Sequence, residues 1–262
     1  MTQHFIWDID PNILTLGPLQ LRWYGLFFVG SFFLGLMIGQ KMFQREGKDP
    51  ALLDTLLIYI LTGTIIGARL AHCLLYEPDF YLAHPLEIFK IWKGGLASHG
   101  GMAGVFVATY LFSKRYNFPY MWLLARTTIP GALTAFFIRL GNFFNSEILG
   151  LPSDKSWAVV FARVDTIARH PVQLYEAFSY LAIFFILVVI YRKVTPAFAT
   201  KFLPGFFLTT IFAVRFFLEY IKTKQEDYTI GVSLSTGQLL SLPIILIGVI
   251  WIVWALRSDK AN

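Results

Sequence analysis

The chain has 262 residues, of which 56% are hydrophobic, 17% aromatic and only 15% charged, and its mean hydropathy is +0.60. Soluble globular domains carry about 25% charged and about 45–50% apolar residues, so this composition excludes an ordinary soluble enzyme, a disulfide scaffold and a disordered tail. The net charge of +6 does not indicate nucleic-acid binding, because no basic run exceeds two residues. In a membrane protein, excess Lys and Arg indicates orientation first. The sequence therefore indicates a polytopic membrane protein.

The apolar segments follow one another from residue 23 to the C-terminal region. The residues before them include Asp8 and Asp10 and lack a basic start followed by an apolar stretch, so no cleavable signal peptide is expected. Continuous apolar runs of about 20 residues are typical of membrane-spanning helices, whereas barrel strands would alternate with period two. We predict an all-α fold of about seven transmembrane helices, over residues 23–40, 52–75, 97–113, 120–144, 173–191, 203–221 and 237–256.

The distribution of Lys and Arg predicts the orientation of these helices. An odd number of crossings places the two termini on opposite sides. Ten basic residues fall in four short segments on one side, and eight are spread over longer connections on the other. The positive-inside rule then places the C-terminus in the cytoplasm and the N-terminus outside, in the periplasm. Residues 1–262 are expected to form one membrane-embedded domain with external connections near 76–96, 145–171 and 222–236.

Small residues and the single cysteine are expected to serve helix packing. Three Gly-x-x-x-Gly spacings begin at Gly35, Gly63 and Gly100, and such spacings let helices approach closely. The third lies beside His99, so a role in a site stays open for it. Cys73 has no second cysteine with which to form an internal disulfide, and its depth in the second span indicates packing.

Four arginines lie inside predicted spans, where each unpaired charge costs about 2.5–3.5 kcal/mol. They must therefore face a polar cavity, pair with carboxylates or bind an anionic ligand. Arg215 and Glu219 share a helix face at i, i+4 and either neutralise each other or face a ligand. Arg126 lies near a helix end and is expected to extend to the interface. The remaining two are Arg69 and Arg139.

Polar side chains are concentrated where the fourth span ends. Arg139, Asn142 and Asn145 recur at i, i+3 and i+6, so a helix that persists would present them on one side. A guanidinium fork matches phosphate oxygens, which makes a phosphate group the natural guest of this face. Glu147 adds a carboxylate nearby. For Asn145 and Gly150, helix capping is an equally good explanation.

Paired glycines flank His99 at the start of the third span. Gly94-Gly95 and Gly100-Gly101 leave room for a substrate or another backbone to come close. Neutral imidazole can accept a proton near physiological pH, so His99 is a candidate general base, with a hydrogen-bonded interfacial histidine as the equal alternative. No metal-ligand spacing, nucleotide-binding Gly loop or Gly-x-Ser-x-Gly elbow is present, and neither a metal nor a cofactor is expected.

Taken together, these segments resemble the bacterial prolipoprotein diacylglyceryl transferase family. Residues 139–150 are similar to the family signature, and residues 94–101 are similar to its histidine motif. Ile138 stands where many members have glycine, and Ala97-Ser98 replaces the more usual Ser-Phe pair. Further agreement, in the same order along nearly the whole chain, comes from Arg22-Trp23-Tyr24-Gly25, His170-Pro171, Gln173-Leu174-Tyr175-Glu176, Arg215 with Glu219, and Gly237-Gln238 with Ser241 and Pro243.

The resemblance implies a reaction, partners and a location. Members of the family move the diacylglyceryl group of phosphatidylglycerol to the thiol of a lipobox cysteine in a preprolipoprotein, which yields a thioether and glycerol phosphate. The implied partners are phosphatidylglycerol, preprolipoprotein signal peptides and membrane lipids, without nucleic acid. The chain is then expected to be a monomeric, multi-pass protein of the bacterial cytoplasmic (inner) membrane.

The resemblance also implies roles for individual residues. The departing phosphate becomes a dianion, which Arg139 and Arg215 would stabilise. A thiol with a pKa near 8.5 needs a base or a positive field to become a thiolate, and His99 is the candidate. Substrate-binding roles fall to Tyr24, Asn142, Asn145, Glu147, Gly150 and Glu219.

Two other functions compete with this interpretation. A transporter or channel also places arginines in the membrane, but the chain shows no duplicated halves, and its polar residues cluster at one face. Another transferase acting on a phospholipid or a polyprenyl phosphate would share an arginine cavity. The joint presence of the histidine motif and the Arg139–Gly150 signature favours the reaction implied above over that other transferase.

Overall fold

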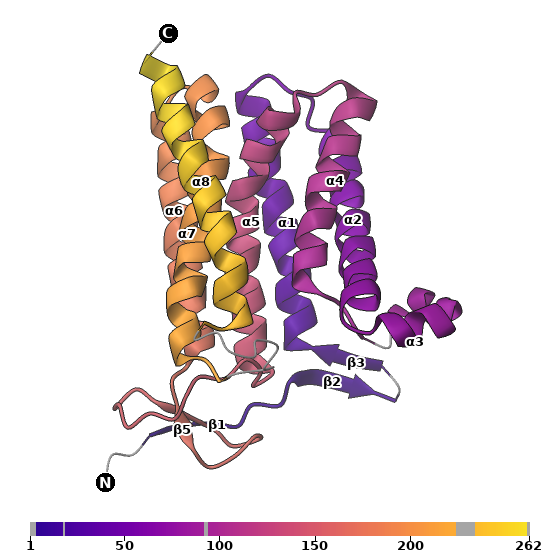
Figure 1. The fold of residues 1–262 in the computed structure, drawn as a ribbon, viewed down its shortest axis with the longest axis vertical. Helices are drawn as coiled ribbons and strands as arrows, with labels where there is room; N and C mark the ends of the chain where they lie inside the picture. The colour runs from indigo at the N-terminus through magenta and orange to yellow at the C-terminus, as the bar shows by residue number, and fades with distance from the viewer. Residues whose placement is uncertain (1–3, 18, 92–93, 224–233, 261–262) are drawn as a thin grey trace. The chain divides into compact units, whose positions relative to one another are not determined.

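The computed structural model describes residues 4–17, 19–91, 94–223 and 234–260. The chain groups into two compact units. The first unit comprises Met1–Ile38 and Thr127–Asn262, and the second comprises Gly39–Arg126. Figure 1 labels the helices and strands in chain order.

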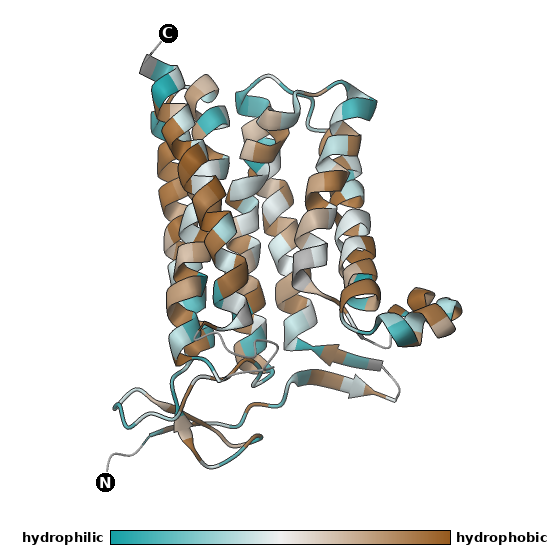
Figure 2. Ribbon diagram, in the orientation of Figure 1, coloured by the Kyte–Doolittle hydropathy of each residue, from teal (hydrophilic) through white to brown (hydrophobic). Residues whose placement is uncertain are grey.

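Seven long helices coincide with the seven predicted segments, and their apolar residues run along most of their length (Figure 2). Six of the described helices are long and apolar enough to cross a membrane, and the 19-residue α4 is not among them. Its glycines and its basic last turn lower its hydropathy. The count of seven crossings therefore stays a prediction. The helices are α1 (Trp23–Arg45), α2 (Leu52–Leu75), α4 (Ser98–Tyr116), α5 (Tyr120–Phe144), α6 (Val172–Lys193), α7 (Pro196–Leu218) and α8 (Thr236–Lys260).

Helix α7 begins well before the predicted residue 203, because the sequence supplies a helix start upstream. The Thr195 hydroxyl accepts a hydrogen bond from the Phe198 backbone N–H at 3.2 Å, and Pro196 occupies the first turn. Proline is favoured at that position because its missing N–H would have no partner there. The helix ends at Leu218 and is followed by the short 3₁₀ turn η3 (Glu219–Ile221).

Short strands make the expectation of an all-α chain incomplete. The hairpin of β2 (Asn12–Leu16) and β3 (Leu19–Arg22) pairs Leu16 with Leu19, and Gly17 has a φ of +57° at its end. Alternating apolar and polar residues with a glycine between them is the usual hairpin signal, and it lies outside the apolar spans. A second sheet has the order β1-β4-β5, formed by β1 (Phe5–Trp7), β4 (Val159–Phe161) and β5 (Ala168–Arg169), with β1 parallel to β4.

Aromatic packing in the first unit fixes the end of α5 against the β1-β4-β5 sheet. The Trp7 ring lies 4.3 Å from the Phe143 ring and 5.0 Å from the Phe144 ring, centroid to centroid. Phe161 on β4 lies 5.6 Å from Phe143 and is fully buried. In the same unit, α6, α7 and α8 lie side by side. The segment that follows α5 therefore starts from a helix end that is packed against this sheet.

Glycine contacts dominate the second unit, where α2 packs along α4. A Cβ added to Gly63 or Gly67 would collide with the backbone of Gly104 or Gly100, and the reverse substitutions would collide as well. Close approach of two helix backbones requires such small residues. The structure confirms the packing interpretation for these spacings. The unit also contains α3 (Pro78–Ala83) and the 3₁₀ helix η1 (Pro85–Phe89).

Arg126 pairs with Glu46, the residue that follows the end of α1, and its extension to the membrane interface stays a prediction. Its side chain is buried, and its guanidinium donates to Glu46 through Nε at 3.0 Å and through Nη2 at 2.6 Å. The long side chain of Arg126 reaches this carboxylate because a paired charge costs less to bury than a single one.

Among the described residues, backbone carbonyls accept the hydrogen bonds of the Arg69 guanidinium. It is buried and donates to the carbonyl oxygens of Glu87 and Gly94, both at 2.6 Å, and of Ile88 at 2.9 Å. Gly95, whose carbonyl lies 3.2 Å from Nη1, has a φ of +73°. Arg69 therefore holds the segment that leads into α4.

Candidate active site

Arg139 lies on α5, five residues before the end of the helix, in the first unit. Its Nε lies 3.0 Å from Oε2 of Glu176, and its Nη1 donates to Oδ1 of Asn142 at 3.2 Å. The predicted shared face of Arg139 and Asn142 is therefore confirmed. The guanidinium is already engaged by an acid, which the sequence analysis did not foresee.

The chain turns sharply after α5 and brings three predicted residues together. The helix ends at Phe144, as the predicted span 120–144 has it, so Asn145 lies just beyond the helix that carries Arg139 and Asn142. Ser146 and Ile148 have φ angles of +55° and +57°, a conformation that side-chain-bearing residues rarely adopt. The turn places Glu147 so that its carboxylate accepts from the side-chain amides of Asn142 and Asn145, both at 3.1 Å.

The turn is fastened to α6 by a buried amide. Gln173 is completely buried, and its Nε2 donates to the Glu147 carbonyl oxygen at 2.6 Å. Backbone strain of the kind seen at Ser146 and Ile148 persists only where the surroundings hold it, and it is common at functional sites. The signature segment thus has a defined shape rather than that of a free loop.

Glu176 joins two cations at the centre of the site. The side chain is completely buried, and its Oε1 accepts from the Nζ of Lys222 at 2.9 Å and from the Tyr180 hydroxyl at 3.4 Å. Tyr180 is also hydrogen-bonded to Arg139. A buried carboxylate requires such partners, because its desolvation is otherwise very costly. Sequence reasoning missed Glu176 and Lys222 as site members.

Lys222 is placed by backbone contacts with the signature segment. It forms an isolated β-bridge with Gly150, and the next residue, Thr223, donates its N–H to the Leu149 carbonyl at 2.9 Å. Its Nζ also lies 3.3 Å from Oε2 of Glu219. The chain after α7 therefore returns to the end of α5.

Arg215 and Glu219 do not pair with each other. Glu219 lies against Lys222, and its Oε1 accepts from the Ser235 hydroxyl at 3.1 Å. The Nε of Arg215 is buried and has no hydrogen-bond partner among the residues that the structure describes. Arg215 still lies close enough to Glu176 to interact electrostatically. The mutual neutralisation of Arg215 and Glu219 is therefore not seen, and the ligand-binding role of Arg215 stays a prediction.

Tyr24 and Gly150 both depend on close approach to a neighbouring element. A Cβ added to Gly141 would lie 2.6 Å from the Tyr24 ring, so this glycine lets α1 and α5 meet, and Tyr24 interacts electrostatically with Arg139 and Glu147. Gly150 is buried and has no left-handed φ, and an added Cβ would lie 2.7 Å from Val172. Gly150 therefore serves close packing, not a left-handed helix cap.

His99 is the second residue of α4, in the second unit. Its side chain lies outside the described part of the chain, so its role as a base stays a prediction. The backbone before it is shaped by Gly94 and Gly95, whose φ angles are +86° and +73°, and both carbonyls accept from Arg69. Arg69 thus holds the residues that directly precede the helix that carries His99.

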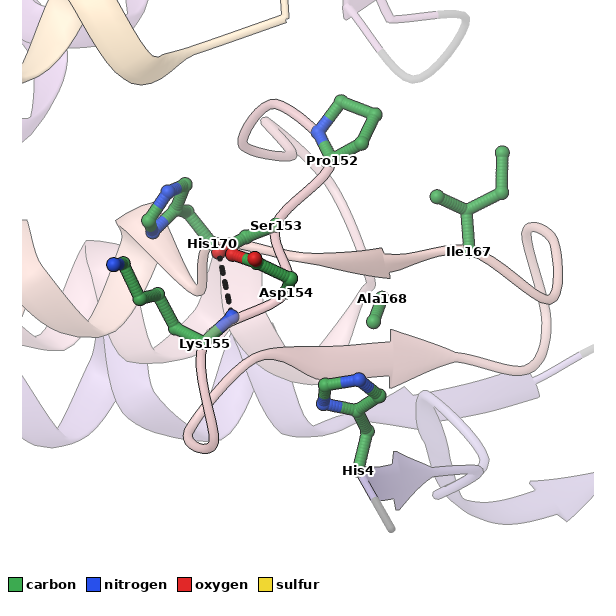
Figure 3. Close-up of a pocket in the computed structure, with 8 residues that line it drawn as sticks. All are labelled: His4, Pro152, Ser153, Asp154, Lys155, Ile167, Ala168 and His170. Atoms are coloured by element: carbon green, nitrogen blue, oxygen red, sulfur yellow. Dashed lines mark hydrogen bonds between the residues drawn. The ribbon is translucent and has the colours of Figure 1, made fainter. Parts of the chain in front are cut away.

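Figure 3 shows a surface hollow of about 580 Å³ elsewhere in the first unit. His170 and Lys155 lie on one side of it and His4 lies on another, and none of the predicted site residues lines it. The described residues also contain no group of three or more His, Cys, Asp or Glu side chains that could hold a metal. The cation-rich cluster at the end of α5 is therefore the candidate active site.

Comparison with known proteins assigns the chain to a family. A sequence model of the prolipoprotein diacylglyceryl transferase family matches residues 11–254. The chain belongs to this family. Proteins named phosphatidylglycerol–prolipoprotein diacylglyceryl transferase from Tolumonas auensis and Chloroherpeton thalassium are 52% and 48% identical to it. The alignments cover 98% and 99% of this chain, and 99% and 97% of the two relatives. A similarly named protein from Porphyromonas gingivalis is 41% identical over 96% of this chain and 95% of its own length.

The match spans all predicted site residues of this family member. The first of them along the chain, Tyr24, and the last, Glu219, both fall inside residues 11–254. Glu176 and Lys222, which the structure adds to the cluster, also fall inside this range. The family assignment and the site geometry therefore concern the same part of the chain.

Proposed function

We propose that this member of the prolipoprotein diacylglyceryl transferase family transfers the diacylglyceryl group of phosphatidylglycerol to the thiol of a lipobox cysteine in preprolipoproteins. Relatives that cover nearly the whole chain carry both substrates in their names. Six apolar helices suit an enzyme whose lipid substrate resides in a bilayer. The observation that carries the proposal is the cluster of Arg139, Lys222 and Arg215 around Glu176, because it gathers three cations, one with an unpartnered Nε among the described residues, near a single buried carboxylate.

The reaction exchanges a carbon–oxygen bond for a carbon–sulfur bond. The cysteine thiolate attacks the carbon of the diacylglycerol moiety that bears the phosphate. The electrons of the broken carbon–oxygen bond leave with the phosphate oxygen. The products are a thioether and glycerol phosphate, whose extra negative charge appears as the bond breaks. Arg139 and Arg215 would stabilise this charge, most strongly where water is scarce. Guanidinium groups suit the task because their N–H donors match phosphate oxygens.

The other site residues would orient the substrates. His99 is our candidate for the group that takes the thiol proton, since a free thiol is mostly protonated at neutral pH. Asn142, Asn145 and Glu147 form one hydrogen-bonded set that can exchange partners with the glycerol headgroup. The remaining substrate-binding assignments are Tyr24, Gly150 and Glu219.

We also propose that the chain is a single, monomeric membrane-embedded domain of the bacterial inner membrane, with seven crossings. The N-terminus would be periplasmic and the C-terminus cytoplasmic. Strand β1 and the end of α8, both in the first unit, lie at opposite ends of its helices (Figure 1), which supports termini on opposite sides. The signature segment lies at the same end as β1 and so would face the periplasm.

A transfer assay tests the function directly. Detergent-purified protein is mixed with phosphatidylglycerol and a lipobox peptide, and peptide mass and released glycerol phosphate are followed together. We expect a diacylglyceryl mass gain, an equal amount of glycerol phosphate and no gain with a Cys→Ser peptide. Folded protein that leaves both substrates unchanged would overturn the proposal and would favour another lipid transferase or transport.

A further inference from the structure

The candidate site contains a carboxylate that the transfer reaction does not require. Glu176 is completely buried, lies 3.0 Å from Arg139 and 2.9 Å from Lys222, and sits within the field of Arg215. It therefore competes with the substrate phosphate for the groups that should bind it. A site whose only task is to bind the phosphate tightly would not place the Glu176 carboxylate at its centre.

The cations and carboxylates of the described cluster lie close to one another. Arg139, Lys222 and Arg215 lie around Glu176, Glu219 pairs with Lys222, and Glu147 lies one hydrogen bond further from Arg139, through Asn142. The phosphodiester of phosphatidylglycerol carries one negative charge. Glycerol phosphate is a monoester with a second pKa near 6, so it carries close to two negative charges at pH 7. Removal of Glu176 would add one net positive charge to the cluster, which favours the doubly charged product over the singly charged substrate.

We propose that Glu176 is a positioning residue that lowers the affinity of Arg139 and Lys222 for phosphate, so that glycerol phosphate can leave after each transfer. This inference rests on the phosphate-binding role of the cluster proposed above. Glu176 acts through the two cations and not on the reacting atoms. Because Oε1 and Oε2 each face a different cation, one carboxylate holds both in place while lowering their joint charge.

The decisive variant is Glu176→Gln, which keeps the side-chain shape and removes the charge. A single charge within about 4–6 Å commonly changes an ionic equilibrium by about 10- to 1000-fold. We therefore expect the inhibition constant of glycerol phosphate to fall by at least about 10-fold, which corresponds to about 1.4 kcal/mol. The Michaelis constant for phosphatidylglycerol should fall less, because the lipid phosphate carries half the charge.

The kinetics should separate chemistry from product release. Single-turnover transfer by Glu176→Gln should be at least as fast as in the wild type, because the developing dianion meets a more positive cluster. Multiple-turnover kcat should fall and show a burst of about one product per enzyme. Calorimetric binding of glycerol phosphate to the purified protein provides a readout that does not depend on turnover.

Glu46→Gln is the matched control, because it also removes one carboxylate from a buried pair with arginine. Its partner, Arg126, belongs to the second unit and is not a predicted site residue. A general loss of packing would affect both variants alike, whereas only Glu176→Gln should tighten glycerol phosphate binding. An unchanged or weakened affinity in folded Glu176→Gln would overturn the inference.

Two further variants keep the inference testable if Glu176→Gln does not fold. Lys222→Gln removes a cation and should weaken glycerol phosphate binding by about the same factor. The double variant Glu176→Gln/Lys222→Gln restores the net charge and should return the affinity to within about threefold of the wild type. A double variant that binds as weakly as Lys222→Gln would contradict the charge-balance argument.

Arg139→Ala separates this inference from the proposal on which it rests. If Arg139→Ala leaves the affinity for glycerol phosphate unchanged, the cluster is not the phosphate site, and both ideas fail. If Arg139→Ala weakens binding while Glu176→Gln has no effect, the phosphate site stands and only the role of Glu176 is wrong.

Discussion

Two buried arginine–glutamate pairs in this protein look alike in composition and differ in what surrounds them. Arg126 and Glu46 form a two-point pair at 3.0 and 2.6 Å, and the Trp122 indole N–H donates to the same carboxylate at 2.7 Å. The Trp122 ring also lies 5.0 Å from the guanidinium carbon of Arg126. The guanidinium binds both carboxylate oxygens here, with good geometry on both sides.

Arg139 and Glu176 form the more crowded pair. Glu176 divides its two oxygens between Arg139 and Lys222, while Arg215 lies nearby with an unpartnered Nε within the described residues. In the first, complete pair one guanidinium binds both oxygens of one carboxylate, whereas in the second two cations share one carboxylate and a third cation lies close by. An arginine inside an apolar span is therefore a weak sign of function on its own. The balance of charges around it distinguishes a structural pair from a binding site.

The largest expected effect comes from breaking the crowded pair. Arg139→Ala should abolish diacylglyceryl transfer, because removing one donor to a developing anion typically costs about 10²–10³-fold and Glu176 also loses a partner. The measurement is peptide mass gain with protein shown to be folded by its elution as a single detergent-solubilised species. Turnover like that of the wild type would refute the phosphate-binding role of Arg139.

His99→Gln should have the next largest effect. A general base contributes about 10²–10⁴-fold, so the transfer rate at neutral pH should fall by that factor. The loss should shrink as the pH approaches the thiol pKa near 8.5, because the peptide then supplies more thiolate by itself. Initial rates between pH 6.5 and 9 test this expectation. A loss below about threefold would demote His99 to a structural residue.

The sequence predicted those features that rest on local patterns. Apolar runs of membrane-crossing length located all seven long helices, and the i, i+3 spacing placed Arg139 beside Asn142. The hairpin of β2 and β3 also has a local signal, the alternation around Gly17, but it lies outside the long apolar runs. Patterns of period 3.6 and period two are read from neighbouring residues, which is why they need no tertiary information.

Partners distant in the chain could not be predicted in the same way. Glu176 and Lys222 are 46 residues apart, and Arg126 and Glu46 are 80 apart. Desolvation requires that buried arginines find a carboxylate or carbonyls, but it does not say which ones. Arg69 illustrates this point, because its partners are the carbonyls of an irregular segment that no composition pattern marks.

Breaking the complete pair should affect stability rather than chemistry. Glu46→Gln leaves Arg126 buried without its counter-charge, which typically lowers the free energy of unfolding by about 3–5 kcal/mol. Transfer per folded molecule should stay within about twofold of the wild type, because neither residue belongs to the cation cluster. Thermal unfolding in detergent and the transfer rate, measured on the same preparation, test both parts. A stable variant with impaired transfer would remove the distinction between the two pairs.

The smallest effect is expected at the only thiol of the chain. Cys73 is completely buried on α2, in the unit that contains the complete pair, and the nucleophile of the reaction belongs to the substrate peptide. Cys73→Ser should leave transfer near normal and lower stability by only about 1 kcal/mol, because a helical serine hydroxyl can bond a carbonyl one turn back. Cys73→Ala is the matched control without a hydroxyl. If both variants fold and neither transfers, the protein's own thiol takes part in the reaction, and the cation cluster alone would not account for catalysis.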